Sequence, residues 1–137
     1  MKQVLTRKTA SSETIDINSI ATQLYMLPTK LQFCHHNTRM HSKHESLNVY
    51  DALNDMRDDI LEKLIGYLGG ERYTKLSLVP IMGYDESMPD RVADEVIEFG
   101  RQLQNWASSM GFGDIENIAQ SYSGEGAKLK YFLTQQG

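Results

Sequence analysis

The stretch of sequence that decides the fold reads SKHESLNVYDALNDMRDDILEKLIGYL, from Ser42 to Leu68. Apolar residues recur along it at spacings of three and four, the pattern of an amphipathic helix with one buried face. Ser42 and Glu45 have the spacing of an N-terminal capping box, and Gly69-Gly70 should end the helix. We therefore predict one long helix here, packed against other helices. Its apolar face consists of Val49, Leu53, Met56, Ile60 and Leu64.

Another amphipathic helix is predicted upstream of this stretch. Asp16 is a suitable N-cap, and the apolar stripe that follows it has helical spacing. Pro28 lies within the stripe and is expected to kink the helix or remove a turn. His35 follows Leu31 by four residues and is the next member of the stripe. The stripe consists of Ile17, Ile20, Leu24, Leu27 and Leu31.

Two more helices are predicted downstream. Ser87, followed closely by a proline, marks the start of the first, and Gly111 marks its end. Asp114 can cap the second, in which Gly124 and Gly126 either weaken the helix or allow another backbone to approach closely. Together the four segments predict an all-α protein built as a four-helix bundle.

The connections between these segments differ in length. The first and last pairs of helices have short links, so each pair should form an antiparallel hairpin. A long crossover, about residues 71–88, separates the second helix from the third. Residues 75–79 within it could form a short strand, which Pro80 would end. Residues 1–15 are polar and read as a flexible N-terminal tail, leaving residues 16–137 as the bundle domain.

The composition excludes several classes of protein. A length of 137 residues fits one domain, and a net charge of −4 argues against a nucleic-acid binder. The three basic residues of the tail, Lys2, Arg7 and Lys8, do not change this, so direct DNA binding is not expected. A single cysteine suits a reducing compartment, and no apolar run is long enough to span a membrane. We therefore expect a cytoplasmic protein.

Potential metal ligands are concentrated in one region. The single cysteine and all four histidines fall between Cys34 and His44, and a series of acidic residues follows. Imidazole and carboxylate together are the ligands of many first-row metal sites. On a helical projection at about 100° per residue, four of these side chains share one narrow strip beside the apolar face. The strip consists of His44, Asp51, Asp58 and Glu62.

Spacing within the strip limits what one helix can do. Asp58 and Glu62 are i,i+4 neighbours and can contact one ion together, whereas His44 and Asp51 stand two turns apart. Further ligands must therefore come from His35 on the first helix or from the strip of a second subunit. The alternative is a solvated acidic face, with His35 as a hydrogen-bonded core histidine. In that interpretation His36 and His41 lie at the surface, and Cys34 packs as a small apolar residue.

The same region resembles a known family. The segments His35-His36-Asn37-Thr38, His44-Glu45-Ser46-Leu47 and Tyr50-Asp51, followed by Asp58 and Glu62-x-x-x-Gly66, resemble the Dps-type mini-ferritins of the ferritin-like superfamily. They are nearer still to small ferritin-like proteins of tailed bacteriophages. Residues 114–118 and 130–134 resemble the last helix of those phage proteins. The stronger match covers about residues 31–70.

The resemblance implies a ferritin-like bundle that forms a homo-oligomer and binds metal ions. For mini-ferritins it implies oxidation of Fe(II) at histidine and carboxylate sites, often between subunits. The matching metal positions are His35, His44, Asp51, Asp58 and Glu62. Iron, di-iron or mononuclear, is the implied metal, with zinc and manganese as alternatives. If the chain is phage-encoded, the compartment is the host cytoplasm.

The chain also departs from the family's pattern. The interval from His44 through Asp51 to Asp58 differs from the usual mini-ferritin spacing. No histidine follows His44, so the two Glu-x-x-His motifs of classical di-iron bundles are absent. The alternative function is a non-catalytic helical protein with a structural or host-interaction role. A hydrolase with His44 as base and Asp51 as its orienting group lacks a nucleophile motif and is the weakest interpretation.

Overall fold

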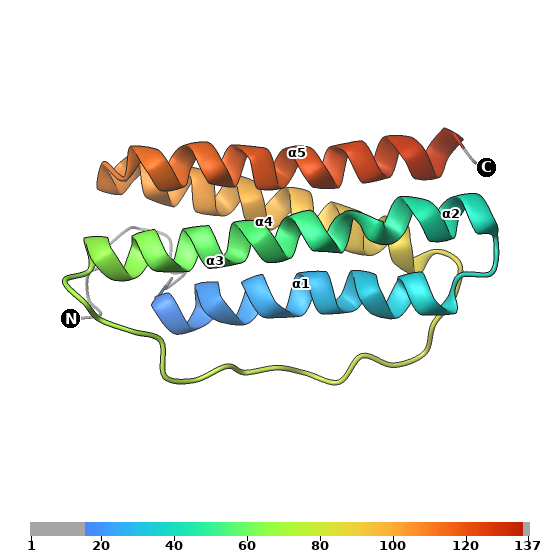
Figure 1. The fold of residues 1–137 in the computed structure, drawn as a ribbon, viewed down its shortest axis with the longest axis horizontal. Helices are drawn as coiled ribbons and strands as arrows, with labels where there is room; N and C mark the ends of the chain where they lie inside the picture. The colour runs from blue at the N-terminus through green and yellow to red at the C-terminus, as the bar shows by residue number, and fades with distance from the viewer. Residues whose placement is uncertain (1–15, 136–137) are drawn as a thin grey trace.

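The computed structural model describes residues 16–135 and is all-helical over that range, which confirms the predicted all-α class. Long helical segments pack side by side as a bundle (Figure 1). The predicted tail, residues 1–15, lies outside the described residues. No helix in the described part of the chain is long and apolar enough to cross a bilayer. The elements are α1 (Ile17–Asn37), α2 (His41–Ser46), the 3-10 helix η2 (Leu47–Val49), α3 (Tyr50–Tyr67), α4 (Met88–Met110) and α5 (Gly113–Gln135).

Helix α1 begins as predicted and continues further than expected. The Ser19 amide donates to the Asp16 carboxylate at 2.8 Å, which confirms the N-cap. The helix runs through Pro28 for nine further residues, so no turn is lost. Pro28 is buried, and Leu27 and Leu31 beside it are fully buried. Burial of this stripe outweighs the roughly 3 kcal/mol that an interior proline costs a helix.

The long helix predicted from Ser42 to Leu68 is divided. Helix α2 begins at His41 with Met40 as its N-cap, so Ser42 lies inside the helix and the predicted capping box is wrong. The 3-10 turn η2 then separates α2 from α3. Asn48 and Val49 in this turn are weak helix formers. Because a 3-10 turn has three residues per turn, it shifts the angular register between α2 and α3. A single projection from residue 44 to residue 62 therefore does not hold.

Helices α4 and α5 form a closely packed hairpin. Helix α4 starts after Ser87 and ends at Gly111, whose φ of 77° gives the expected left-handed cap. Helix α5 begins at Gly113, so Asp114 lies in its first turn and does not cap it. A Cβ on Gly100 would lie 2.7 Å from the Ser123 amide nitrogen, which shows how near the two backbones approach.

The connection between α3 and α4 runs along the bundle beside α1 (Figure 1). Helices α3 and α4 point the same way, so the chain must return over the length of the bundle between them. Residues 71–85 form neither helix nor strand, so the strand considered for residues 75–79 is absent from the described structure. Side chains of α1 and of its C-cap Thr38 hold it in place. Asn18 Oδ1 accepts from the Thr74 and Lys75 amides (2.9 and 3.3 Å), and Thr22 Oγ1 accepts from the Ser77 amide (3.0 Å). The Tyr25 hydroxyl hydrogen-bonds that of Tyr73 (2.8 Å), and the Thr38 hydroxyl hydrogen-bonds that of Tyr84.

Candidate functional site

The imidazoles of His35 and His44 form a reciprocal clasp between α1 and α2. Nδ1 of His35 lies 2.8 Å from the carbonyl oxygen of His44, and Nδ1 of His44 lies 2.7 Å from the carbonyl oxygen of His35. The two rings stack with centroids 3.7 Å apart and planes inclined by 27°. The edge of Tyr50 approaches the ring of His35 at 5.7 Å. Both histidines are half-buried.

The clasp fixes which nitrogen of each ring carries a hydrogen. A carbonyl oxygen can only accept a hydrogen bond, so each Nδ1 must donate and carry the proton. In the neutral imidazole, Nε2 then holds the lone pair. A backbone carbonyl bonded to Nδ1–H is the usual arrangement behind a histidine that ligates metal through Nε2. The pair therefore presents two Nε2 atoms with the chemistry of ligands.

Local structure explains why the two rings meet. His35 lies in the last turn of α1, where the carbonyls lack partners within the helix. The Thr38 amide closes that turn by donating to the Cys34 carbonyl at 2.9 Å, and the His44 amide donates to the Met40 carbonyl at 2.9 Å. These bonds place the two helices on either side of a short turn. The rings then satisfy one free carbonyl each.

Asp51 lies apart from the clasp, at the start of α3. Its side chain is exposed and borders an open surface hollow of about 410 Å3 between α3 and α5. Glu45 and Glu125 border the same hollow, and Lys128 lies 4.0 Å from Glu125. Phe132 closes it with an apolar wall. The setting is polar and open to water.

Asp58 and Glu62 lie further along α3, with both side chains exposed. The Asp58 carboxylate accepts a hydrogen bond from Nε of Arg57 at 3.3 Å. Asp55 and Asp59 are exposed as well, as expected, and Asp59 pairs with Lys63 at 2.8 Å. Fourteen residues separate His44 from Asp58, which is about 21 Å of helix rise. One ion therefore cannot contact the clasp and the Asp58–Glu62 pair of the same chain.

Within one chain, the structure brings together two of the five predicted metal residues, His35 and His44. Among residues 16–135, no group of three or more His, Cys, Asp or Glu side chains is arranged to hold one ion. The three carboxylates face solvent on α3.

The remaining members of the histidine cluster lie where the alternative interpretation placed them. His36 and His41 are exposed, and His41 lies 3.9 Å from Glu45. Cys34 is fully buried, and this burial raises the pKa of its thiol to about 11. The thiol is therefore protonated at neutral pH, as befits an apolar packing residue.

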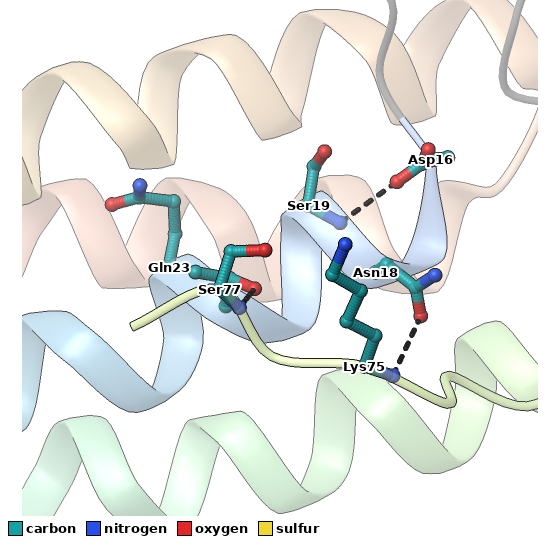
Figure 2. Close-up of a pocket in the computed structure, with 7 residues that line it drawn as sticks. Asp16, Asn18, Ser19, Gln23, Lys75 and Ser77 are labelled. Carbon is teal, nitrogen blue, oxygen red and sulfur yellow. Dashed lines mark hydrogen bonds between the residues drawn. The ribbon is translucent and has the colours of Figure 1, made fainter. Parts of the chain in front are cut away.

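Two polar features were not predicted from the sequence. The Arg57 guanidinium stacks over the ring of Tyr25 at 4.5 Å, and Tyr25 hydrogen-bonds Tyr73. A polar hollow of about 450 Å3 lies between the start of α1 and the connection. Figure 2 shows side chains that border it, with Lys75 extending from the connection across the start of α1. Both depend on where the connection lies, which no local pattern reveals. The hollow is bordered by Asp16, Asn18, Ser19, Thr22, Gln23, Lys75 and Ser77.

Comparison with protein-family models, with curated proteins and with solved structures finds no match to this chain.

Proposed function

We propose that this chain is a mini-ferritin-like protein that binds divalent first-row metal ions, iron foremost, through Nε2 of His35 and His44. The observation that carries the proposal is the reciprocal clasp, because both Nδ1 atoms are committed to carbonyl oxygens. Each ring is thereby held in the tautomer that makes Nε2 available to a metal. The interpretation as a purely structural clasp uses the same hydrogen bonds but leaves the two Nε2 atoms without a role.

Carboxylates from a second copy of the chain complete the site in this proposal. Asp58 and Glu62 are i,i+4 neighbours on the exposed face of α3, so both can contact one ion brought by a neighbouring molecule. Two imidazoles and two carboxylates suit iron, zinc or manganese. The carboxylates neutralise the ion and favour its ferric state, which is the chemistry a ferroxidase site supplies to Fe(II).

The arrangement of the helices supports a ferritin-like frame. Helices α3 and α4 run in the same direction and are joined by an extended connection of the bundle's length (Figure 1). A bundle with one long crossover at this place is the ferritin-type topology. The similarity of residues 31–70 to mini-ferritins points to the same frame.

The test is oxidation of Fe(II) in air by metal-stripped protein, followed through ferric absorbance. We expect the native chain to oxidise Fe(II) at least tenfold faster than the double variant Asp58→Asn, Glu62→Gln. Both residues are exposed, so the variant should fold normally. A matched control, Asp55→Asn with Asp59→Asn, removes two carboxylates from the same helix and should behave as the native chain. Equal rates in all three proteins would reject the ferroxidase role.

Metal binding is tested separately from oxidation, by calorimetric titration with Zn²⁺ under conditions where no redox step occurs. We expect His35→Gln and His44→Gln each to abolish tight binding, because each removes one Nε2 ligand. Circular dichroism distinguishes this from unfolding, since a glutamine amide can still donate to the facing carbonyl. Unchanged Zn²⁺ affinity in both folded variants would reject the clasp as a metal site.

A second candidate function is a non-catalytic helical protein with a structural or host-interaction role. One observation favours it: three large apolar side chains of the connection, Leu78, Val79 and Met82, are exposed. A metal-free, fully folded protein that forms a stable complex with a partner would support it over the metal-binding proposal.

A further inference from the structure

Tyr25 of α1 and Tyr73 of the connection meet through their hydroxyl groups. The two oxygen atoms lie 2.8 Å apart, and the ring centroids lie 6.1 Å apart with the planes inclined by 55°. This centroid distance is that of aromatic rings in contact, so the ring edges meet as well as the hydroxyl groups. An ortho carbon of each ring, the carbon beside the hydroxyl-bearing one, therefore lies close to the other ring.

Other contacts hold both rings in these positions. The Arg57 guanidinium lies 4.5 Å from the centre of the Tyr25 ring. On the connection, the Thr74 amide directly after Tyr73 donates to Asn18 of α1 at 2.9 Å. Both tyrosines are half-buried. Groups that are held side by side react with each other far faster than with a partner that must diffuse to them.

This pair differs from the other tyrosines of the described chain. Among residues 16–135 it is the only contact between two tyrosine rings. Tyr67 and Tyr131 each lie against a phenylalanine ring, which has no phenol group to oxidise. The hydrogen bond with Tyr25 raises the pKa of Tyr73, so its hydroxyl keeps its proton at neutral pH. Two phenols in contact are thus a feature of this one place in the fold.

We propose that Tyr25 and Tyr73 are a site of oxidative modification, at which a one-electron oxidant produces an intramolecular dityrosine bond. Each phenol gives up one electron and one proton, and the two ring radicals join through one ortho carbon each. The hydrogen on each of these carbons then moves as a proton to the oxygen of its own ring, which restores both hydroxyl groups. Hydrogen peroxide, acting through a haem peroxidase, takes up the two electrons and two protons and leaves as two water molecules.

The new bond ties the connection to α1 by a covalent link. The two tyrosines are 48 positions apart in the sequence, so the bond closes a long loop. A cross-link between distant residues restricts the unfolded chain and thereby stabilises the fold. The modification therefore fixes on the bundle a segment that hydrogen bonds alone hold beside α1. It does not rest on the metal-binding proposal and needs no metal in the protein.

The experiment is treatment of the metal-stripped full chain, in dilute solution, with a haem peroxidase and hydrogen peroxide. We expect a product of monomer size that shows dityrosine fluorescence and is two hydrogens lighter. Its digest should contain a cross-linked peptide pair with Tyr25 and Tyr73. Tyr25→Phe and Tyr73→Phe should each lower the yield of this product at least tenfold. Circular dichroism checks that both variants fold, since phenylalanine keeps the ring and loses only the hydroxyl.

A matched control removes the two exposed tyrosines of residues 16–135 by changing Tyr67→Phe together with Tyr131→Phe. These side chains are 43% and 59% exposed, so they can cross-link one molecule to another. The control should give as much of the monomer-size product as the native chain. The proposal is overturned if the native chain forms dityrosine only between molecules, or if Tyr73→Phe forms the monomer-size product as readily.

The effect on the connection is tested by thermal unfolding before and after the same treatment. We expect the treatment to raise the melting temperature of the native chain, because its monomer carries the cross-link. Tyr73→Phe undergoes the same side oxidations without the cross-link and should show no such rise. Equal changes in the two proteins would contradict the claim that the bond fixes the connection to α1.

Discussion

One side chain of the core, Tyr122, carries a polar group that packing does not require. The Tyr122 hydroxyl is fully buried, and no described residue hydrogen-bonds it. Its ring lies edge-on to Phe99 at 5.6 Å. An unpaired buried hydroxyl is destabilising, whereas an apolar group of the same shape is not. We expect Tyr122→Phe to raise the free energy of unfolding by about 1 kcal/mol, measured by urea denaturation at pH 7.

The buried hydroxyl of Tyr122 also makes the stability of the fold depend on pH. Burial raises the pKa of Tyr122 above its ordinary value of 10.0, because the ionised phenolate is disfavoured inside the bundle. The folded protein thus holds this proton more tightly than the unfolded chain does. The stabilisation that comes from this proton is fully present below pH 10, the pKa of tyrosine in the unfolded chain. It is lost as the pH rises toward the higher pKa of Tyr122 in the folded protein. Tyr122→Phe should therefore lose less stability between pH 10 and 11. Parallel curves for the two proteins would contradict this assignment.

At the scale of the element, glycines set the distance between α4 and α5. A Cβ on Gly100 would lie 2.7 Å from the Ser123 nitrogen and 3.0 Å from the Ala119 carbonyl oxygen, both backbone atoms that cannot turn aside. Gly100→Ala should lower the free energy of unfolding by about 1–3 kcal/mol despite the better helix propensity of alanine. The measurement is chemical denaturation.

Gly124 on α5 is the matched control, because nothing lies within 4 Å of a Cβ built on it. Gly124→Ala should raise stability by about 0.5–1 kcal/mol through backbone entropy and propensity. If both alanine variants were stabilised alike, the close approach of α4 and α5 would be disproved. The sequence left open whether the glycines of α5 weaken the helix or admit another backbone. A Cβ built on Gly126 would lie 3.0 Å from the Ala93 carbonyl oxygen of α4, so the second interpretation holds there.

Local chemistry decides which elements the sequence could predict. Asp16 caps α1 with its side chain, and Gly111 ends α4 with its left-handed backbone, so these ends are correct to within a residue. Helix α4 also starts after Ser87 as predicted, although Ser87 makes no side-chain cap hydrogen bond. The 3-10 turn at Leu47–Val49 could not be predicted, because the apolar spacing continues through it. Leu47 is fully buried there, and tertiary packing overrides the local pattern.

At the scale of the whole molecule, the candidate site could be predicted from the sequence only in part. The concentration of histidines between residues 35 and 44 is visible in the sequence, and the short turn after α1 brings two of them together. The clasp itself depends on the carbonyl oxygens of His35 and His44, which lie at helix ends and accept from the two rings. The spacing of residues in the sequence does not reveal these hydrogen bonds. In the proposed site, Asp58 and Glu62 meet the clasp only across two copies of the chain, and that information lies outside any single chain.

The direction of α4 relative to α3 sets the length that the connection must have. Helix α4 has 23 residues, about 35 Å of rise, and the connection returns over a similar distance. Deleting residues 73–84 would leave eight residues between the helices, which reach about 28 Å at most. We expect this variant to lose cooperative thermal unfolding and the native fluorescence of Trp106, because α4 can no longer occupy its place beside α1. Replacing residues 76–83 by glycine and serine at equal length should preserve both signals, with a lower melting temperature. A deletion variant that melts like the native chain would mean that α3 and α4 run in opposite directions.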